Sequence, residues 1–120
     1  MHELSVCQAL IGQVEKVARE NGAHRVVSIV IAVGPLSGVE AGLLEHAYPV
    51  AAAGTLAEHA TLTIETVPVR VRCRSCGAET GAQVNRLVCG ACGDWQVDVI
   101  AGEEMLLTRV EIETDHAAVH

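Results

Sequence analysis

Two cysteine pairs organise this chain: Val71-Arg72-Cys73-Arg74-Ser75-Cys76 and, after a twelve-residue spacer, Cys89-Gly90-Ala91-Cys92-Gly93. Two Cys-x-x-Cys pairs at this separation place four thiolates at the corners of a tetrahedron. A structural zinc ion takes that arrangement at roughly 2.3 Å for each Zn–S bond. A glycine after each pair suits the tight turns in which backbone N–H groups approach the sulfurs. The sequence therefore predicts a zinc site made by Cys73, Cys76, Cys89 and Cys92.

Two other uses of these cysteines stay open at this point. Two disulfides are one alternative, but residues 1–7 have neither the basic nor the apolar region of a secretory signal. We therefore expect a cytoplasmic protein whose thiols stay reduced. An Fe(Cys)4 electron carrier would use similar pairs, so the spacing alone does not name the metal. The short spacer and the single aromatic candidate for covering the site, Trp95, favour zinc.

Composition limits the size of the core. The chain has 120 residues, of which 50% are hydrophobic and only 2% aromatic, and it has no Phe. This length suffices for one modest aliphatic core and a small appended module. A metal that contributes on the order of 10 kcal/mol to the folding of its module would compensate for so small a core.

The net charge and the lengths of the apolar runs argue against two classes of partner. Eight basic and fifteen acidic residues give a net charge of −7, which repels phosphate backbones and argues against nucleic acid as a partner of the zinc module. The longest apolar run, residues 29–33, is far shorter than the roughly 20 residues that span a bilayer. We expect a soluble protein without a nucleic-acid or membrane partner.

Hydrophobic periodicity predicts the elements around the cysteines. Three- and four-residue steps predict an amphipathic helix over 4–19, ended at Asn21-Gly22. On its stripe, Cys7 is expected as a small buried hydrophobe. A β-branched run predicts a buried strand over 24–33. Ser37-Gly38-Val39-Glu40 matches a capping box, so a second helix is expected from there, ended or kinked at Pro49.

Strands are expected over 61–67 and 104–113, the latter with Leu106, Thr108, Val110 and Ile112 on one face, and residues 96–100 are expected to pair within the zinc module. The fold class is therefore α+β: a small α/β layer of two helices on a mixed three-stranded sheet, with an inserted zinc-ribbon-like module. The expected domains are an α/β domain over 1–69 and 103–114, a zinc-binding module over 70–102 and a tail over 115–120.

The tripeptide Met1-His2-Glu3 has a specific coordination chemistry, although most such tripeptides are idle tails. The α-amine of Met1 and the amide nitrogen and Nδ1 of His2 can close fused five- and six-membered chelate rings. Glu3 can supply a fourth donor through its amide or carboxylate. Square-planar, nitrogen-rich sites of this kind suit Ni(II) or Cu(II) rather than Zn(II).

Met-His-Glu at the start, Gly34-x-x-Ser37-x-Val39-Glu40, Gly54-Thr55 and the paired Cys-x-x-Cys together resemble the HypA/HybF family of hydrogenase-maturation nickel metallochaperones over essentially the whole length. The resemblance implies Ni(II) binding through Met1, His2 and Glu3, and structural zinc at the four cysteines. It also implies cooperation with a HypB-like GTPase and delivery to a hydrogenase large-subunit precursor, and it allows a homodimer. Glu40 occupies the family position of an acidic residue near the nickel site, although it could equally serve as a helix cap.

One feature departs from the family pattern: Gly90 stands where many members have Pro after the third cysteine. The sequence contains no nucleophile paired with a base, no phosphate-cradling loop and no carboxylate pair at catalytic spacing, so we expect no enzyme. Two rival functions stay open. They are an Fe(Cys)4 electron carrier and a zinc-ribbon adaptor without a transferable metal.

Overall fold

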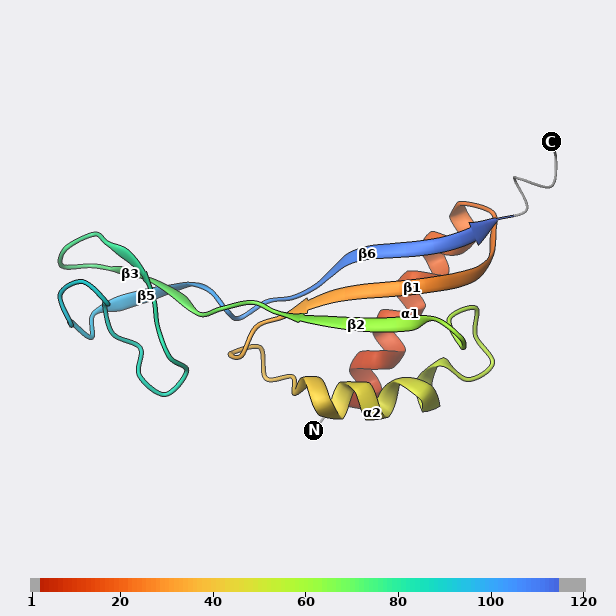
Figure 1. Cartoon of the computed structure of the whole chain (residues 1–120), viewed down its shortest axis with the longest axis horizontal. Helices are drawn as coiled ribbons and strands as arrows, with labels where there is room; N and C mark the ends of the chain where they lie inside the picture. The colour runs from red at the N-terminus through yellow and green to blue at the C-terminus, as the bar shows by residue number, and fades with distance from the viewer. Residues whose placement is uncertain (1–2, 115–120) are drawn as a thin grey trace. The chain divides into compact units, whose positions relative to one another are not determined.

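A computed structural model describes residues 3–114 of the chain. The elements, in chain order, are α1 (Glu3–Glu20), β1 (Ala23–Val33), α2 (Ala41–Ala52), β2 (Thr61–Thr66), β3 (Arg70–Cys73), β4 (Glu79–Gly81), β5 (Val97–Ala101) and β6 (Met105–Thr114) (Figure 1). The described residues form two compact units. Among residues 3–114, the first comes from the segments 3–31, 40–64 and 107–114, and the second from 32–39 and 65–106. Within residues 3–114, neither helix combines the length and the apolar character that a membrane crossing requires.

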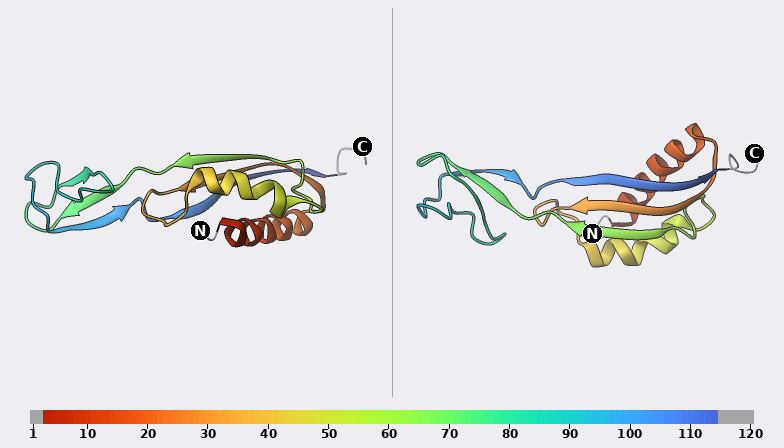
Figure 2. Two further views of the ribbon diagram at one scale, coloured as in Figure 1. Left: turned by 90° about the horizontal axis from the view of Figure 1, so that it is seen from below. Right: turned by 45° about the horizontal axis from the view of Figure 1, so that its top comes forward.

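The first unit is a helical layer on a three-stranded sheet with the strand order β2-β1-β6. β1 and β2 run in the same direction and β6 runs against them, so the sheet is mixed (Figures 1 and 2). α1 crosses the face of the sheet turned away from the viewer in Figure 1, and α2 packs against α1. The prediction of two helices on a mixed three-stranded sheet is confirmed.

The core of this unit is aliphatic, as the composition requires. Its buried side chains come from both helices, β1 and the loop after α2: Cys7, Leu10, Ile11, Val14, Ala18, Val26, Ile29, Ile31, Leu44, Tyr48, Ala52 and Ala57. Cys7 is fully buried and its thiol donates to the Leu44 carbonyl at 3.4 Å. Burial also raises the pKa of this thiol. Cys7 therefore has the core position that its place on the helical stripe predicts.

The end of α1 follows the predicted stop signal. Asn21 donates from its side-chain amide to the Val17 carbonyl at 2.8 Å, and Gly22 has φ +69°. This left-handed conformation is cheap for glycine and ends the helix. The three- and four-residue steps also place Leu4 and Val17 on the apolar stripe, but these side chains are 44% and 38% exposed. They lie at the margins of the stripe, where the core no longer reaches.

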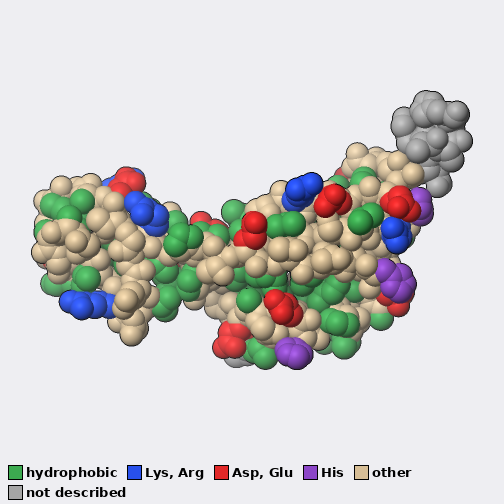
Figure 3. Space-filling model, in the orientation of Figure 1, with side chains coloured by type: hydrophobic (Ala, Val, Ile, Leu, Met, Phe, Trp, Pro, Cys, Tyr) green, Lys and Arg blue, Asp and Glu red, His purple; other side chains and the backbone are tan. Residues whose placement is uncertain are grey.

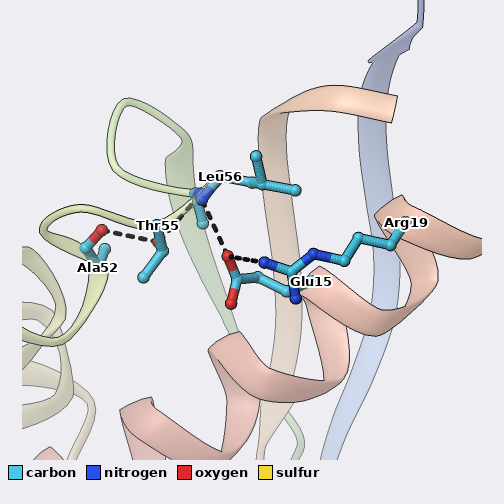
Figure 4. A network of polar contacts seen from close by, with 6 residues as sticks. Glu15, Arg19, Ala52, Thr55 and Leu56 are labelled. Atoms are coloured by element: carbon cyan, nitrogen blue, oxygen red, sulfur yellow. Dashed lines mark hydrogen bonds and ion pairs between the residues drawn. The ribbon is translucent and has the colours of Figure 1, made fainter. Parts of the chain in front are cut away.

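A polar network ties α1 to the loop that follows α2 (Figure 4). The Glu15 carboxylate accepts from the Leu56 N–H at 3.1 Å and from Arg19 at 3.4 Å. In the same loop, Thr55 donates from its hydroxyl to the Ala52 carbonyl at 2.7 Å. Since the Glu15 side chain is only 18% exposed, its bond to the backbone amide is partly shielded from water.

The start of α2 differs from the predicted capping box. The residue before the helix is Glu40, which makes no side-chain cap hydrogen bond. Ser37 lies in the preceding turn, where its hydroxyl accepts from the Val39 N–H at 3.2 Å. A serine side chain can close a local turn by this bond as readily as it caps a helix. The helix then continues through Pro49 to Ala52.

The exposed surface of the first unit carries mixed charges. On the face drawn in Figure 3, acidic and basic side chains lie side by side rather than forming a patch of one sign. The Glu113 carboxylate contacts both His24 and Arg25 at 3.1 Å, and Arg109 lies 3.7 Å from Glu111. Exposed pairs of this kind contribute about 0–1 kcal/mol each. They therefore contribute little to the stability of the unit.

Two glycines meet in the second unit, where the turn after β1 lies against the segment between β5 and β6. The Gly34 N–H donates to the Glu104 carbonyl and the Leu36 N–H to the Gly102 carbonyl, both at 2.8 Å. A Cβ on Gly34 would overlap the backbone of Gly102, which itself has φ +111°. Glycine at residue 34 is therefore required by the close approach of two backbones.

The burial of β6 also differs from the prediction. Val110 and Ile112 are half-buried as expected, but Thr108 is exposed and Leu106 is 53% exposed. The half-buried positions change from odd to even numbers along the strand. A single alternating face was therefore the wrong model for all ten residues of β6.

Candidate metal centre

The four cysteines belong to a segment built around a second, small sheet with the strand order β4-β3-β5. Only Cys73 lies in a strand, and the other three lie in the turns and loops that follow. β3 pairs antiparallel with both neighbours, with Val71 opposite Thr80 and Val99. Cys73 ends β3, and its partner across the sheet is Val97 in β5. β5 confirms the expected pairing of the segment after the second cysteine pair, whereas β3 and β4 were not predicted because both are very short.

Each cysteine pair forms a turn with the same hydrogen bonds. In the first, the backbone N–H groups of residues 75 and 76 point to the Cys73 sulfur at 3.3 and 3.4 Å. In the second, those of residues 91 and 92 point to the Cys89 sulfur at 3.3 and 3.4 Å. Gly77 and Gly93 close the turns with φ values of +77° and +79°. We call these two turns, residues 73–77 and 89–93, the first and second knuckle.

The knuckles bring the four sulfurs together. All four Sγ atoms lie within 4.8 Å of one another. Cys73 and Cys92 are 3.6 Å apart, as are Cys76 and Cys89. A tetrahedron with Zn–S bonds of roughly 2.3 Å has edges of about 3.8 Å. The cluster is therefore already close to the size that a four-coordinate zinc ion requires.

The thiols in this cluster do not all ionise alike. Backbone N–H groups, first that of Cys92, lower the pKa of Cys89 to about 6. The backbone N–H of Asp94 also lowers the pKa of Cys92, but the neighbouring thiol of Cys73 and burial outweigh it and raise this pKa to about 12. Four thiols so close together resist a second negative charge unless a cation joins them. Metal binding would supply that cation and release the protons.

All five cysteines lie in the described part of the chain and are free thiols, so the structure contains none of the disulfides kept open above. Trp95 follows the second knuckle but is 74% exposed. The expectation that it covers the site is wrong. Cys73 and Cys89 are buried, whereas Cys76 and Cys92 are exposed.

Side chains outside the cysteines connect the two knuckles. The Ser75 hydroxyl donates to the Asp94 carboxylate, whose other oxygen accepts from the Gln96 N–H at 3.1 Å. The bond from Ser75, together with that from the Gln96 amide, lowers the pKa of Asp94. Thr80, in β4, accepts at its hydroxyl from the Gly90 N–H at 2.8 Å. Sequence reasoning missed Asp94 and Thr80, because neither belongs to a metal-ligand motif.

The predicted nickel ligands are placed only in part. Met1 and His2, like His116 and His120, lie outside the described residues. Glu3 begins α1 and is 7% exposed.

The fold and the site define a class: a small metal-binding α+β protein with a four-cysteine, zinc-ribbon-like module. Comparison with known proteins gives the family. The family model described as hydrogenase/urease nickel incorporation metallochaperone, HypA, matches residues 1–112. The chain belongs to the HypA family.

Relatives with the same name cover nearly the whole chain. "Hydrogenase maturation factor HypA" of Nitrosospira multiformis is 52% identical over 114 residues, which are 95% of this chain and 99% of the relative. The protein of that name from Aquifex aeolicus is 39% identical, over 96% of this chain and 100% of its own. The solution structure of the Ni metallochaperone HypA from Helicobacter pylori matches with a TM-score of 0.70 and 28% identity, covering 95% of this chain and 99% of that one.

Proposed function

We propose that this protein binds Ni(II) at its amino terminus and delivers it in the cytoplasm for the maturation of a [NiFe] hydrogenase, acting as a carrier and not as an enzyme. The observation that carries the proposal is the family match over residues 1–112, which includes the Met-His-Glu start and the complete cysteine quartet. Membership in a family of nickel-incorporation metallochaperones supports nickel as the cargo. The chemistry of the first three residues supplies donors that suit it.

The proposed nickel ligands are the Met1 amine, the amide and Nδ1 nitrogens of His2, and Glu3. Glu3 is buried at the start of α1, which supports a fixed position for its carboxylate. α1 packs against α2, and the thiol of Cys7 bonds the Leu44 carbonyl. Cys7 lies one turn after Glu3, and Leu44 one turn after Glu40. The two helix starts therefore share one end of the unit, which favours a role for Glu40 beside the nickel ligands.

Cys73, Cys76, Cys89 and Cys92 are the proposed ligands of a structural Zn(II) ion. The fit rests on their Sγ separations of 3.6 Å and on the N–H groups that face Cys73 and Cys89. A bound zinc ion would supply folding energy to the module. Elemental analysis tests this choice of metal, since one zinc per colourless chain is expected and a red protein containing iron would contradict it.

The proposed partners are a HypB-like GTPase and a hydrogenase large-subunit precursor. The proposal also allows this chain to act as a homodimer. A pull-down of the purified GTPase with untagged protein tests the first partnership. We expect binding without any GTP hydrolysis by this chain itself. Hydrolysis that is lost on a point substitution in this chain would contradict the proposal.

Nickel titration of protein with an authentic amino terminus is the decisive experiment. His2→Ala should abolish the tight site and leave zinc content unchanged, whereas His46→Ala, at an exposed position on α2, is the matched control and should bind normally. The amine and imidazole have reference pKa values of about 7.7–8.0 and 6.5, and both must be unprotonated to bind. Nickel affinity should therefore fall steeply between about pH 8 and pH 6.

A residue added ahead of Met1 turns the α-amine into an amide while every side chain stays in place. Tagged and untagged proteins with equal affinity and equal d–d absorption would show that the amino-terminal chelate is wrong. A protein that binds zinc but no nickel in either form would instead be the zinc-ribbon adaptor.

A further inference from the structure

The two knuckles follow one backbone pattern but differ in their side chains. The Cys73 N–H donates to the carbonyl of Ala78, five residues on, and the Cys89 N–H donates to that of Asp94, also five residues on, both at 2.9 Å. Ala78 has no polar side chain at this position. Asp94 has a carboxylate, which reaches across to the first knuckle and accepts from Ser75.

This carboxylate is held on both sides. One oxygen binds the Ser75 hydroxyl and the other binds the Gln96 N–H at 3.1 Å. Ser75 lies between Cys73 and Cys76, so its hydroxyl connects the interior of the first knuckle to the residue that directly follows the second. The Ser75–Asp94 bond therefore links the two cysteine pairs through side chains other than the cysteines.

A second connection runs the other way. Thr80, in the strand that follows the first knuckle, accepts from the N–H of Gly90 inside the second knuckle. A Cβ on Gly90 would lie 3.1 Å from the Thr80 Cβ, so the Gly90 backbone lies close to the Thr80 side chain. A proline at residue 90 would have no N–H to donate. The glycine at this position therefore makes a bond that proline could not.

We propose that Asp94, Ser75 and Thr80 are positioning residues of the metal site, which hold the two knuckles at the separation of a tetrahedral four-sulfur cluster. The inference rests on the proposed zinc site and adds to it the side chains that set the geometry of its ligands. Partners of this kind around metal ligands, which do not themselves touch the metal, commonly affect affinity by about 10- to 100-fold.

The test is a zinc competition titration of the whole chain against a chromophoric chelator, with Co(II) absorption as a second readout of site geometry. Ser75→Ala and Asp94→Ala should each weaken zinc binding by about 10-fold or more and reduce the tetrahedral Co(II) bands. The double variant should be little weaker than either single one, because both remove the same bond. Asp94→Asn should recover most of the affinity, since its amide oxygen can still accept from the Gln96 N–H while its NH2 group donates to the Ser75 hydroxyl.

Glu79→Ala is the matched control, because Glu79 is an exposed carboxylate of the same module paired with Arg72 at 2.7 Å. It should stay within about threefold of the unmodified protein. If Asp94→Asn, Asp94→Ala and Glu79→Ala all weaken zinc binding to the same extent, Asp94 acts only through its charge and the proposal is wrong. Normal zinc affinity and Co(II) bands in Ser75→Ala would also overturn it. Absence of zinc binding by the unmodified protein would instead refute the zinc site itself.

Discussion

Replacing Cys76 with alanine should release the metal and unfold the zinc module while both helices stay folded. The module has little else to hold it. Between residues 70 and 102, all within the described part of the chain, Val71 is the only buried aliphatic side chain. Burying one valine contributes about 1.5–3 kcal/mol, whereas a structural zinc ion contributes about 10–16 kcal/mol. The metal term is therefore several times larger than the apolar term.

The first unit has a core of its own. Leu10, Ile11, Val14, Ile29 and Leu44 are each no more than 4% exposed, and none of them lies in the zinc module. Cys76→Ala should therefore lose zinc by elemental analysis and lose amide NMR dispersion for residues 70–102. The helical circular dichroism of α1 and α2 should remain. Cys7→Ala, which removes a thiol outside the quartet, is the control and should keep one zinc per chain.

Two results would refute this reasoning. A Cys76→Ala protein that keeps one tightly bound zinc would show that three cysteines suffice, contrary to the closed four-sulfur site. Loss of all helical signal on chelation would show that the sheet and helices depend on the metal. In that case the division into an α/β domain and a separate zinc module would be wrong.

Three further predictions concern stability and pH. Glu15→Ala leaves the Leu56 N–H without its acceptor and should lower the free energy of unfolding by roughly 1–3 kcal/mol in urea titrations; no change would show that water replaces the carboxylate. Gly34→Ala forces a methyl group into an opposing backbone and should cost about 1–3 kcal/mol or more by the same assay. The charge of Arg25 lowers the pKa of Glu113, so its carboxyl 13C shift should titrate below the usual range, and Arg25→Ala should raise it. The stabilisation from this pair should be present above the ordinary glutamate pKa and lost as pH falls through the lowered one.

Much of this fold could be predicted because periodicity reports burial. The three- and four-residue steps of residues 4–19 gave α1, and the β-branched run gave β1 at the centre of the sheet. The cysteine spacing predicted the metal cluster, because two Cys-x-x-Cys turns that face each other bring their four sulfurs within a few ångströms of one another. In each case a repeated residue type at fixed spacing carried the signal.

The misses arose where one residue type has several uses. Ser37 closes a turn instead of capping α2, and both roles need only a hydroxyl near a backbone N–H. β4 has three residues, too few for any period. The bond between Ser75 and Asp94 joins residues 19 positions apart, and nothing in the spacing of a serine and an aspartate indicates that they meet.

The two proposed metals are separated by donor chemistry rather than by strength of binding. Nickel and zinc have similar intrinsic affinities for many ligands. A protein that carries nickel and keeps zinc must therefore hold them in two sites that differ in coordination geometry and in the rate of ligand exchange. The four-cysteine site takes every ligand from one module, and its sulfurs already lie at tetrahedral separation. A metal held there has no open position for an incoming ligand. The proposed amino-terminal chelate is different, because its donors lie at the end of the chain and compete with protons near neutral pH. In the proposed function, a partner that offers its own ligands would therefore displace the nickel stepwise while the zinc stays in place.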